Sequence, residues 1–95
     1  MTKDEASLLL YLESRSVDDG GSVDVRRMNS DDFEIVTRWI EEGFIQFGRI
    51  AFHSIKSSGI THWVKLSERA WIIAHTERRA RADRGFAKYY ERIEP

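Results

Sequence analysis

Apolar residues near the start of the chain recur at helical spacing. Those that share a face are Ala6, Leu9, Leu10 and Leu12. Thr2 and Glu5 have the spacing of a capping box, in which each side chain accepts a hydrogen bond from the other residue's backbone amide. The pattern predicts a helix over about residues 3–15, ended by the turn-rich segment 17–22, and a short strand at residues 23–25.

A second apolar stripe follows at helical spacing. Its members are Phe33, Val36 and Ile40, widened by Ile35 and Trp39. We expect Ser30 to cap this helix and Gly43 to end it, with a single helical turn just before it at residues 26–28. The opposite arc of the helix has a local charge of −3 and holds Ser30, Asp31, Glu34, Thr37, Arg38, Glu41 and Glu42.

Residues 44–66 change to a pattern of β-branched and aromatic residues, with a polar turn signal between the two halves. In the preferred register Phe52 pairs with His62, and the apolar face then holds Ile50, Phe52, Val64 and Leu66. The other face would show Arg49, Ala51, His53, Thr61, Trp63 and Lys65. An alternative that pairs Phe52 with Trp63 places Lys65 on the apolar face and is less favourable.

A further helix is expected to start at Ser67 and to run to about residue 82, with apolar early turns and basic later turns. Gly85 is expected to break it. The short last helix beyond would carry an apolar stripe formed by Phe86, Tyr89, Tyr90 and Ile93. The chain is therefore predicted to divide into a domain at residues 1–84 and a C-terminal tail at residues 85–95.

The length and composition are those of one globular domain. The chain has 95 residues, 41% of them hydrophobic and 12% aromatic, and a chain of this size holds a single core. It contains no cysteine, which excludes a disulfide scaffold, a thiolate zinc site and a cysteine nucleophile. No apolar run approaches the about 20 residues that span a bilayer. We expect a soluble, cytoplasmic α+β protein that is mostly helical and has no membrane partner.

Charge is distributed unevenly along the chain. The net charge is −1, but residues 1–48 carry −6 and residues 49–95 carry +5. No carboxylate occurs in the 25 residues from Gly43 to Ser67, although charged residues make up 33% of the chain. One interpretation is a solvated surface with uneven charge. The other is a basic part that meets an anionic partner and an acidic part that offers a surface for a basic one.

The chain shows no pattern typical of an enzyme or a metal centre. The aspartates around the first turn lack the alternating ligands and terminal glutamate of a calcium loop. Residues 19–22 lack the lysine and the spacing of a phosphate-binding loop. His53 and His62 lie on opposite faces in the preferred register, and no serine is placed beside a base. We predict a non-enzymatic protein without a cofactor or metal.

The order of elements resembles that of winged helix-turn-helix domains. Residues 29–45 (NSDDFEIVTRWIEEGFI) resemble the recognition helix and its exit, and residues 64–70 (VKLSERA) resemble the second wing strand and the start of the next helix. Ala70 stands where that family commonly has glycine. The likeness covers residues 6–76. The length and the C-terminal helix are also similar to those of small winged-helix proteins of phage and prophage origin.

The resemblance implies binding of double-stranded DNA, with one helix in the major groove and the wing, residues 44–66, along the phosphates. The acidic arc of the second helix departs from this pattern, because DNA affinity comes largely from Lys and Arg at phosphates. We predict a transcriptional regulator whose wing makes most contacts, provided that its cations converge on one surface. The expected DNA-binding residues are Arg26, Arg27, Ser30, Thr37, Arg38, Arg49, His53, Lys56, Ser57, Ser58, Trp63 and Lys65.

The resemblance also favours a homodimer through the C-terminal helices. Its expected interface residues are Trp71, Ile72, Phe86, Tyr89, Tyr90 and Ile93. Trp63 has a second interpretation, packing against the C-terminal helix of the same or another chain. The alternative function is a winged-helix protein–protein interaction module that binds no DNA and uses the acidic helix face.

Overall fold

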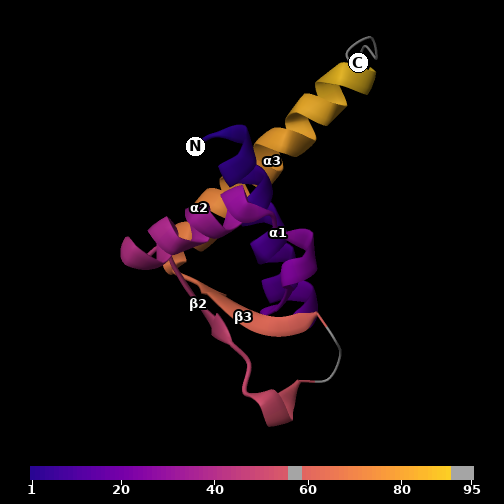
Figure 1. Ribbon diagram of the computed structural model, residues 1–95. Helices are drawn as coiled ribbons and strands as arrows, with labels where there is room; N and C mark the ends of the chain where they lie inside the picture. The colour runs from indigo at the N-terminus through magenta and orange to yellow at the C-terminus, as the bar shows by residue number, and fades with distance from the viewer. Residues whose placement is uncertain (56–58, 91–95) are drawn as a thin grey trace.

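The computed structural model of the protein describes residues 1–55 and 59–90. These residues form three α-helices and a three-stranded antiparallel sheet (Figure 1), which confirms the expected α+β class. The elements in order are α1 (Lys3–Asp19), β1 (Ser22–Asp24), the 3-10 helix η1 (Val25–Arg27), α2 (Ser30–Glu41), β2 (Ile45–Arg49), the 3-10 helix η2 (Phe52–Ser54), β3 (Ile60–Leu66) and α3 (Glu68–Tyr90).

Helix α1 begins with the expected capping box. The Glu5 amide donates to Thr2 Oγ1 over 3.1 Å, and the Thr2 amide donates to Glu5 Oε1 over 3.0 Å. The helix extends beyond its expected end at residue 15. An ion pair of 2.9 Å between Arg15 and Asp19 supports the added turn. Gly20 then caps the helix in the left-handed conformation, with φ 64°.

Helix α2 is capped by Asn29 rather than by Ser30. Asn29 Oδ1 accepts from the Asp32 amide over 2.9 Å, and Asp32 Oδ2 accepts from the Asn29 amide over 3.1 Å. This reciprocal pair satisfies the free amides at the helix start, so Ser30 is simply the first helical residue. The expected cap at Ser30 is therefore wrong by one position.

The expected apolar stripe of α2 is only partly buried. Val36 and Trp39 are buried, whereas Phe33 is 39% and Ile40 is 43% exposed. The Trp39 ring packs edge-on against Phe44, with centroids 5.1 Å apart. This contact with the chain that enters the sheet turns the Val36–Trp39 side of the helix to the core, so the predicted stripe was centred on the wrong residues.

Strand β3 is the central strand of the sheet, in the order β1-β3-β2. In the β2–β3 pair Ile45 lies opposite Leu66, and Arg49 lies opposite His62. Both registers considered from the sequence place Phe52 opposite a residue of β3. Both are wrong, because β2 ends at Arg49 and Phe52 lies in η2, outside the ladder.

The register is set at the base of the hairpin rather than at its tip. Ile45 and Leu66 are both buried in the core, and the Ser67 amide donates to the Phe44 carbonyl over 3.1 Å just below them. Because side chains alternate between the two faces, fixing this one pair fixes every later position. The β2–β3 ladder therefore ends at Arg49, and Phe52–Ser54 form η2 instead of continuing the strand.

The core lies between the inner face of the sheet and the three helices. Strand β1 pairs with β3, and the backbone just before β1 approaches β3 closely at Gly21. The φ angle of Gly21 is 90°, and a Cβ atom there would fall 2.6 Å from the Val64 carbonyl oxygen. The core residues are Leu8, Leu9, Leu12, Val23, Met28, Val36, Trp39, Phe44, Ile45, Val64, Leu66, Ala70 and Ala74.

Helix α3 runs without interruption from Glu68 to Tyr90, so the predicted break at Gly85 is wrong. Outside the helix itself, no atom lies within 4 Å of the place where a Cβ of residue 85 would stand, and nothing there forces a turn. Only Ala70 and Ala74 of α3 are buried, and its last turns project from the body (Figure 1). The molecule is 56 Å long with a radius of gyration of 15.5 Å, against about 12 Å for a compact chain of this length.

Candidate nucleic-acid interface

The wing presents cations on both faces of the hairpin. Arg49 pairs with His62 and lies on the inner face, whereas Trp63 and Lys65 lie on the outer face. The inner face also carries Ile45, Phe47, Val64 and Leu66. The prediction that Arg49, Trp63 and Lys65 share one face is wrong, because the true register moves Arg49 to the other side of the ribbon.

Trp63 lies across Gly48 on the outer face of the sheet. A Cβ atom at Gly48 would fall 2.8 Å from Cζ2 of the indole ring, so the glycine leaves the space that the ring occupies. The ring remains 38% exposed. Trp63 is therefore positioned by packing on β2 of its own chain, and the rest of its ring is accessible to a partner.

His62 is partly buried between Phe47 and Arg49. The rings of Phe47 and His62 stack with centroids 5.3 Å apart, and Thr61 Oγ1 lies 2.8 Å from His62 Nδ1. Burial lowers the pKa of the imidazole from its usual 6.5, and the positive charge of Arg49 lowers the pKa further. His62 is thus neutral at pH 7, and Arg49 carries the charge at this end of the inner face.

Arg26 is paired with Asp24 at the base of the wing loop. Its Nε and Nη2 atoms contact Asp24 Oδ1 and Oδ2 over 2.9 and 3.0 Å, a bidentate arrangement. These hydrogen bonds lower the pKa of the Asp24 carboxyl and raise the pKa of Arg26. The guanidinium also packs so closely against Gly59 that a Cβ there would fall 2.2 Å from Nε. Arg26 therefore packs against Gly59, and the Asp24 carboxylate neutralises its charge.

Arg38, the one cation on the acidic arc of α2, contacts two carboxylates. Its Nη2 atom lies 2.6 Å from Glu5 Oε2 in α1, and its Nε atom lies 4.0 Å from Glu42 Oε1. The pKa of the Glu5 carboxyl is lowered mainly because Thr2 donates hydrogen bonds to it, and the Arg38 charge adds to this. With Arg38 engaged in this way, the exposed arc of α2 presents chiefly carboxylates.

The other expected DNA contacts are dispersed. Arg27 in η1 and His53 in η2 are exposed. Ser30 is exposed at the start of α2, and Thr37 donates its hydroxyl to the Phe33 carbonyl over 2.9 Å. Outside the described residues lie Lys56, Ser57 and Ser58.

The expected dimer residues lie exposed along α3. Trp71 and Ile72 are near its start, and three aromatic residues are near its end. The latter are Phe86, Tyr89 and Tyr90. The Phe86 and Tyr90 rings lie 5.2 Å apart, so this part of the helix shows a continuous aromatic surface. Ile93 lies outside the described residues.

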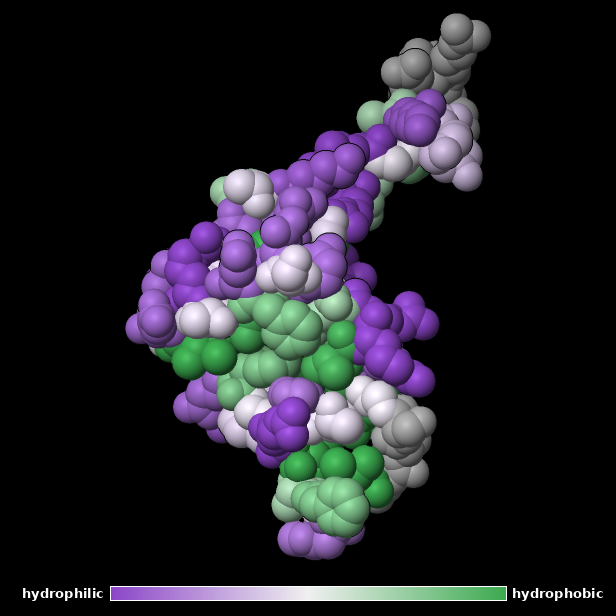
Figure 2. Space-filling model, in the orientation of Figure 1, coloured by the Kyte–Doolittle hydropathy of each residue, from purple (hydrophilic) through white to green (hydrophobic). Residues whose placement is uncertain are grey.

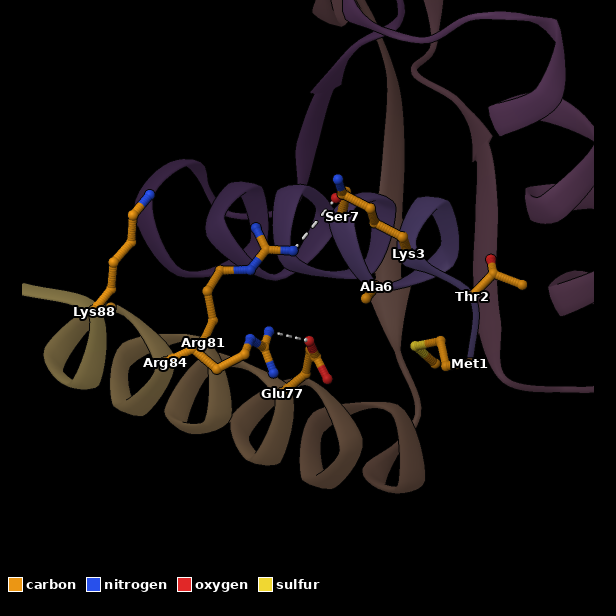
Figure 3. Close-up of a pocket in the computed structure, with 10 residues that line it drawn as sticks. Met1, Thr2, Lys3, Ala6, Ser7, Glu77, Arg81, Arg84 and Lys88 are labelled. Carbon is orange, nitrogen blue, oxygen red and sulfur yellow. Dashed lines mark hydrogen bonds and ion pairs between the residues drawn. The ribbon is translucent and has the colours of Figure 1, made fainter.

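A cationic cleft of about 720 Å³ lies between the start of α1 and the second half of α3 (Figure 3). Arg81 reaches across it to Ser7 Oγ over 3.3 Å, and Arg84 pairs with Glu77 of its own helix over 3.2 Å. The other charged residues that line the cleft are Lys3 and Lys88. No sequence pattern predicts this cleft, because the cleft combines residues from opposite ends of the chain.

A second feature absent from the sequence-based predictions is the ion pair that joins α3 to α1. The Glu13 carboxylate is buried and accepts from Arg78 Nε. Arg78 Nη2 donates to the Leu10 carbonyl over 3.3 Å and to Ser14 Oγ over 3.0 Å. The available signal was Glu13 itself, an acid four residues after Leu9 on the apolar face of α1, because a charge in that position needs a partner.

Across residues 1–55 and 59–90, no three histidine, aspartate or glutamate side chains are grouped so as to hold a metal ion. Within the same ranges, no helix is both long enough and apolar enough to cross a membrane.

Comparisons with known proteins bear on the fold. No protein-family model matches the chain, and no curated protein matches it. A solved structure is similar over 99% of this chain and 77% of its own length, with a TM-score of 0.62 and 19% sequence identity. It is described as a reported archaeal mechanosensitive channel that is a structural homolog of MarR-like transcriptional regulators. The chain has the winged-helix fold that its sequence predicts.

We expect the His62 imidazole to titrate below pH 6.5 in the folded protein and to respond to Arg49. Between the two pKa values the unfolded chain binds more protons, so the contribution of His62 to stability is complete above pH 6.5 and is lost as the pH falls through that value toward the folded pKa. Arg49→Gln should raise the pKa of His62 only part of the way to 6.5, because burial is the larger cause. An NMR titration of the histidine ring signals measures this. The same pKa in both proteins would show that the Arg49 charge does not act on His62.

Proposed function

We propose that the protein binds double-stranded DNA as a winged-helix transcriptional regulator in which the wing makes most of the phosphate contacts. The observation that carries the proposal is a hairpin with Arg49 on one face and Lys65 on the other, within 25 residues that contain no carboxylate. DNA affinity comes largely from Lys and Arg that neutralise phosphates. A ribbon with cations on both faces suits a DNA groove, which has a phosphate backbone on either side.

The cations available for this role are fewer than the sequence predicts, and they do not converge on one surface, because Arg49 and Lys65 lie on opposite faces of the hairpin. The condition attached to the sequence-based prediction is therefore not met. The proposal depends instead on a hairpin that carries a cation on each face. In the described part of the chain, Arg27, Arg49 and Lys65 have no carboxylate within 4.0 Å, whereas Arg26 and Arg38 are paired. Three phosphate contacts correspond to a slope of about −3 in a plot of log affinity against log salt. We therefore propose weak, strongly salt-dependent binding. The likeness to a structural homolog of MarR-like regulators supports the DNA-binding proposal at the level of fold. A phage or prophage origin stays a prediction.

In this proposal α2 positions the wing but is not a strong reader of the major groove. Its exposed arc has a charge of −3, and its arginine is engaged with Glu5 and Glu42. One carboxylate can accept a hydrogen bond from a cytosine amino group. The phosphates of both DNA strands repel the four carboxylates of this arc. Helix α2 therefore lowers the affinity for DNA unless the cations of the wing offset this repulsion.

A protein-interaction module is the second candidate, favoured by the exposed surface of α2. Phe33 and Ile40 lie seven residues apart, on one side of the helix, and are 39% and 43% exposed. Glu34 and Glu41 follow them directly. Figure 2 shows hydrophobic side chains gathered on this face of the molecule between α2 and the hairpin. An apolar strip rimmed by carboxylates suits a basic protein surface.

We further propose a homodimer through α3. The last turns of this helix project from the body (Figure 1) and expose an aromatic surface that the described part of the chain does not cover. Monomeric proteins rarely expose apolar patches of this kind. A two-fold dimer would cover both copies at once and would bring two wings to two DNA half-sites.

Replacing Arg49 and Lys65 together by glutamine should weaken binding to a 30-base-pair duplex at least tenfold at about 50 mM salt. It should also reduce the salt slope by about 2, because two phosphate contacts are lost. Fluorescence anisotropy of labelled DNA across a salt series measures both quantities.

The matched control is Arg79→Gln, which removes an exposed positive charge from α3 instead of from the wing. It should change the affinity less than about threefold, since no phosphate contact is assigned to it. An equal loss in the control and the wing variant would contradict wing-centred binding. If the wild type does not bind DNA even near 50 mM salt, the interaction module is favoured.

Deleting residues 85–95 should convert a dimer into a monomer. Light scattering should give about twice the chain mass of 11.1 kDa for the wild type and about one chain mass for the truncated protein. The domain should stay folded, because the core contains no residue beyond Ala74, and circular dichroism checks this. A dimer that survives the deletion would remove this segment from the interface.

A further inference from the structure

The most exposed large hydrophobic side chain in residues 1–55 and 59–90 is Phe52, at the far end of the wing. It is 91% exposed, and its neighbours Ala51, His53 and Ser54 are exposed as well. Figure 2 shows hydrophobic surface at this end of the hairpin. Phe52 is not among the core residues, so its ring is available to contact a partner.

The backbone that carries Phe52 is held by hydrogen bonds. The Ile50 amide donates to the Thr61 carbonyl over 2.8 Å, which ties the loop to β3. The Ser54 amide donates to the Ala51 carbonyl over 2.8 Å and closes the turn of η2 around Phe52. The phenylalanine is thus presented outward by an ordered turn.

The sequence on either side of Phe52 favours an anionic partner. Arg49 precedes it by three residues and His53 follows it, and the sequence from Gly43 to Ser67 contains no carboxylate. A partner that suits both features has negative charge at its surface and apolar, stackable groups just inside. DNA has this arrangement, because its stacked bases lie between two phosphate backbones.

We propose that Phe52 is a wedge that enters the minor groove, inserts between two base pairs and kinks the duplex; this inference rests on the proposed DNA binding. The minor groove is about 6 Å wide, so it admits a side chain presented by a single short turn such as η2 but not an α-helix. Apolar side chains inserted in this way unstack a base step and bend DNA by about 20–90°.

The wedge also gives the protein a source of sequence preference that does not depend on the acidic helix α2. Pyrimidine–purine steps such as TA and CA unstack easily, whereas A-tracts are stiff. Inserting a side chain costs the energy of unstacking one base step, so the protein binds best where that step unstacks easily. This preference requires no hydrogen bond to a base edge. We therefore assign to this protein the readout of DNA flexibility at the step where Phe52 inserts.

The test uses the full chain and two 30-base-pair duplexes, each labelled at its ends with a donor and an acceptor fluorophore. One duplex has TA steps at its centre and the other has an A-tract. Anisotropy measures binding at low salt, and energy transfer between the ends measures bending. The wild type should bind both duplexes and should increase energy transfer more on the TA duplex.

The Phe52→Ala variant should still bind at higher protein concentration, but at saturation its energy transfer should stay within about a tenth of the value of free DNA. Phe52→Leu keeps an apolar wedge and should retain bending. Phe33→Ala is the matched control, since it removes an exposed phenylalanine from α2 rather than from the wing, and it should bend DNA like the wild type.

The outcomes separate the two proposals. No change in anisotropy for the wild type overturns DNA binding and the wedge together. Binding without a rise in energy transfer, or full bending by Phe52→Ala, overturns the wedge and leaves DNA binding intact. Vesicles that contain phosphatidylserine provide a further arm. If Phe52→Ala abolishes vesicle binding while DNA bending is unchanged, Phe52 belongs to a membrane contact and the wedge is wrong.

Discussion

The buried contact between Ile45 and Leu66 determines where each charged side chain of the wing lies. Side chains alternate across a strand, so anchoring one apolar pair in the core fixes the face of every residue that follows. Arg49 falls on the inner face beside His62, and Lys65 falls on the outer face. The wing is therefore a ribbon charged on both sides instead of one basic surface. Groove entry suits this geometry better than attachment along a single backbone, and the exposed ring at the far end fits the same mode of binding.

Several arginines outside the wing are paired with carboxylates of the same chain. Arg26 pairs with Asp24, Arg38 with Glu5, and Arg78 with the buried Glu13. The last pair has a structural role, because a buried carboxylate that loses its partner destabilises a protein strongly. It joins α3 to α1 in the middle of α3, and Arg81 joins the two helices again further along α3 through Ser7.

Several local features of the fold were predictable from the sequence, whereas the pairing of distant segments was not. The Thr2–Glu5 capping box and the end of α2 at Gly43 involve residues within one turn of each other, and they are present. The hairpin register failed because the tip residues Ile50 and Phe52 look as apolar as the true core positions, and only docking at the base distinguishes them. Gly85 failed because a glycine lowers helix propensity without forbidding a helix.

The candidate site was predictable to the same extent. The sequence identified the carboxylate-free stretch and its cations correctly, since these are properties of composition. It did not show that Glu5 would meet Arg38 across 33 positions of the chain, nor that Arg49 and Lys65 would lie on opposite faces of the hairpin.

In the proposed complex the wing, and not the acidic helix α2, contacts DNA. Two-dimensional NMR of the 15N-labelled protein during addition of a DNA duplex at low salt tests it most directly, because every amide reports separately. If the wing contacts DNA, the largest shifts fall within residues 45–66. Shifts concentrated in residues 30–41, with the wing unaffected, would contradict it.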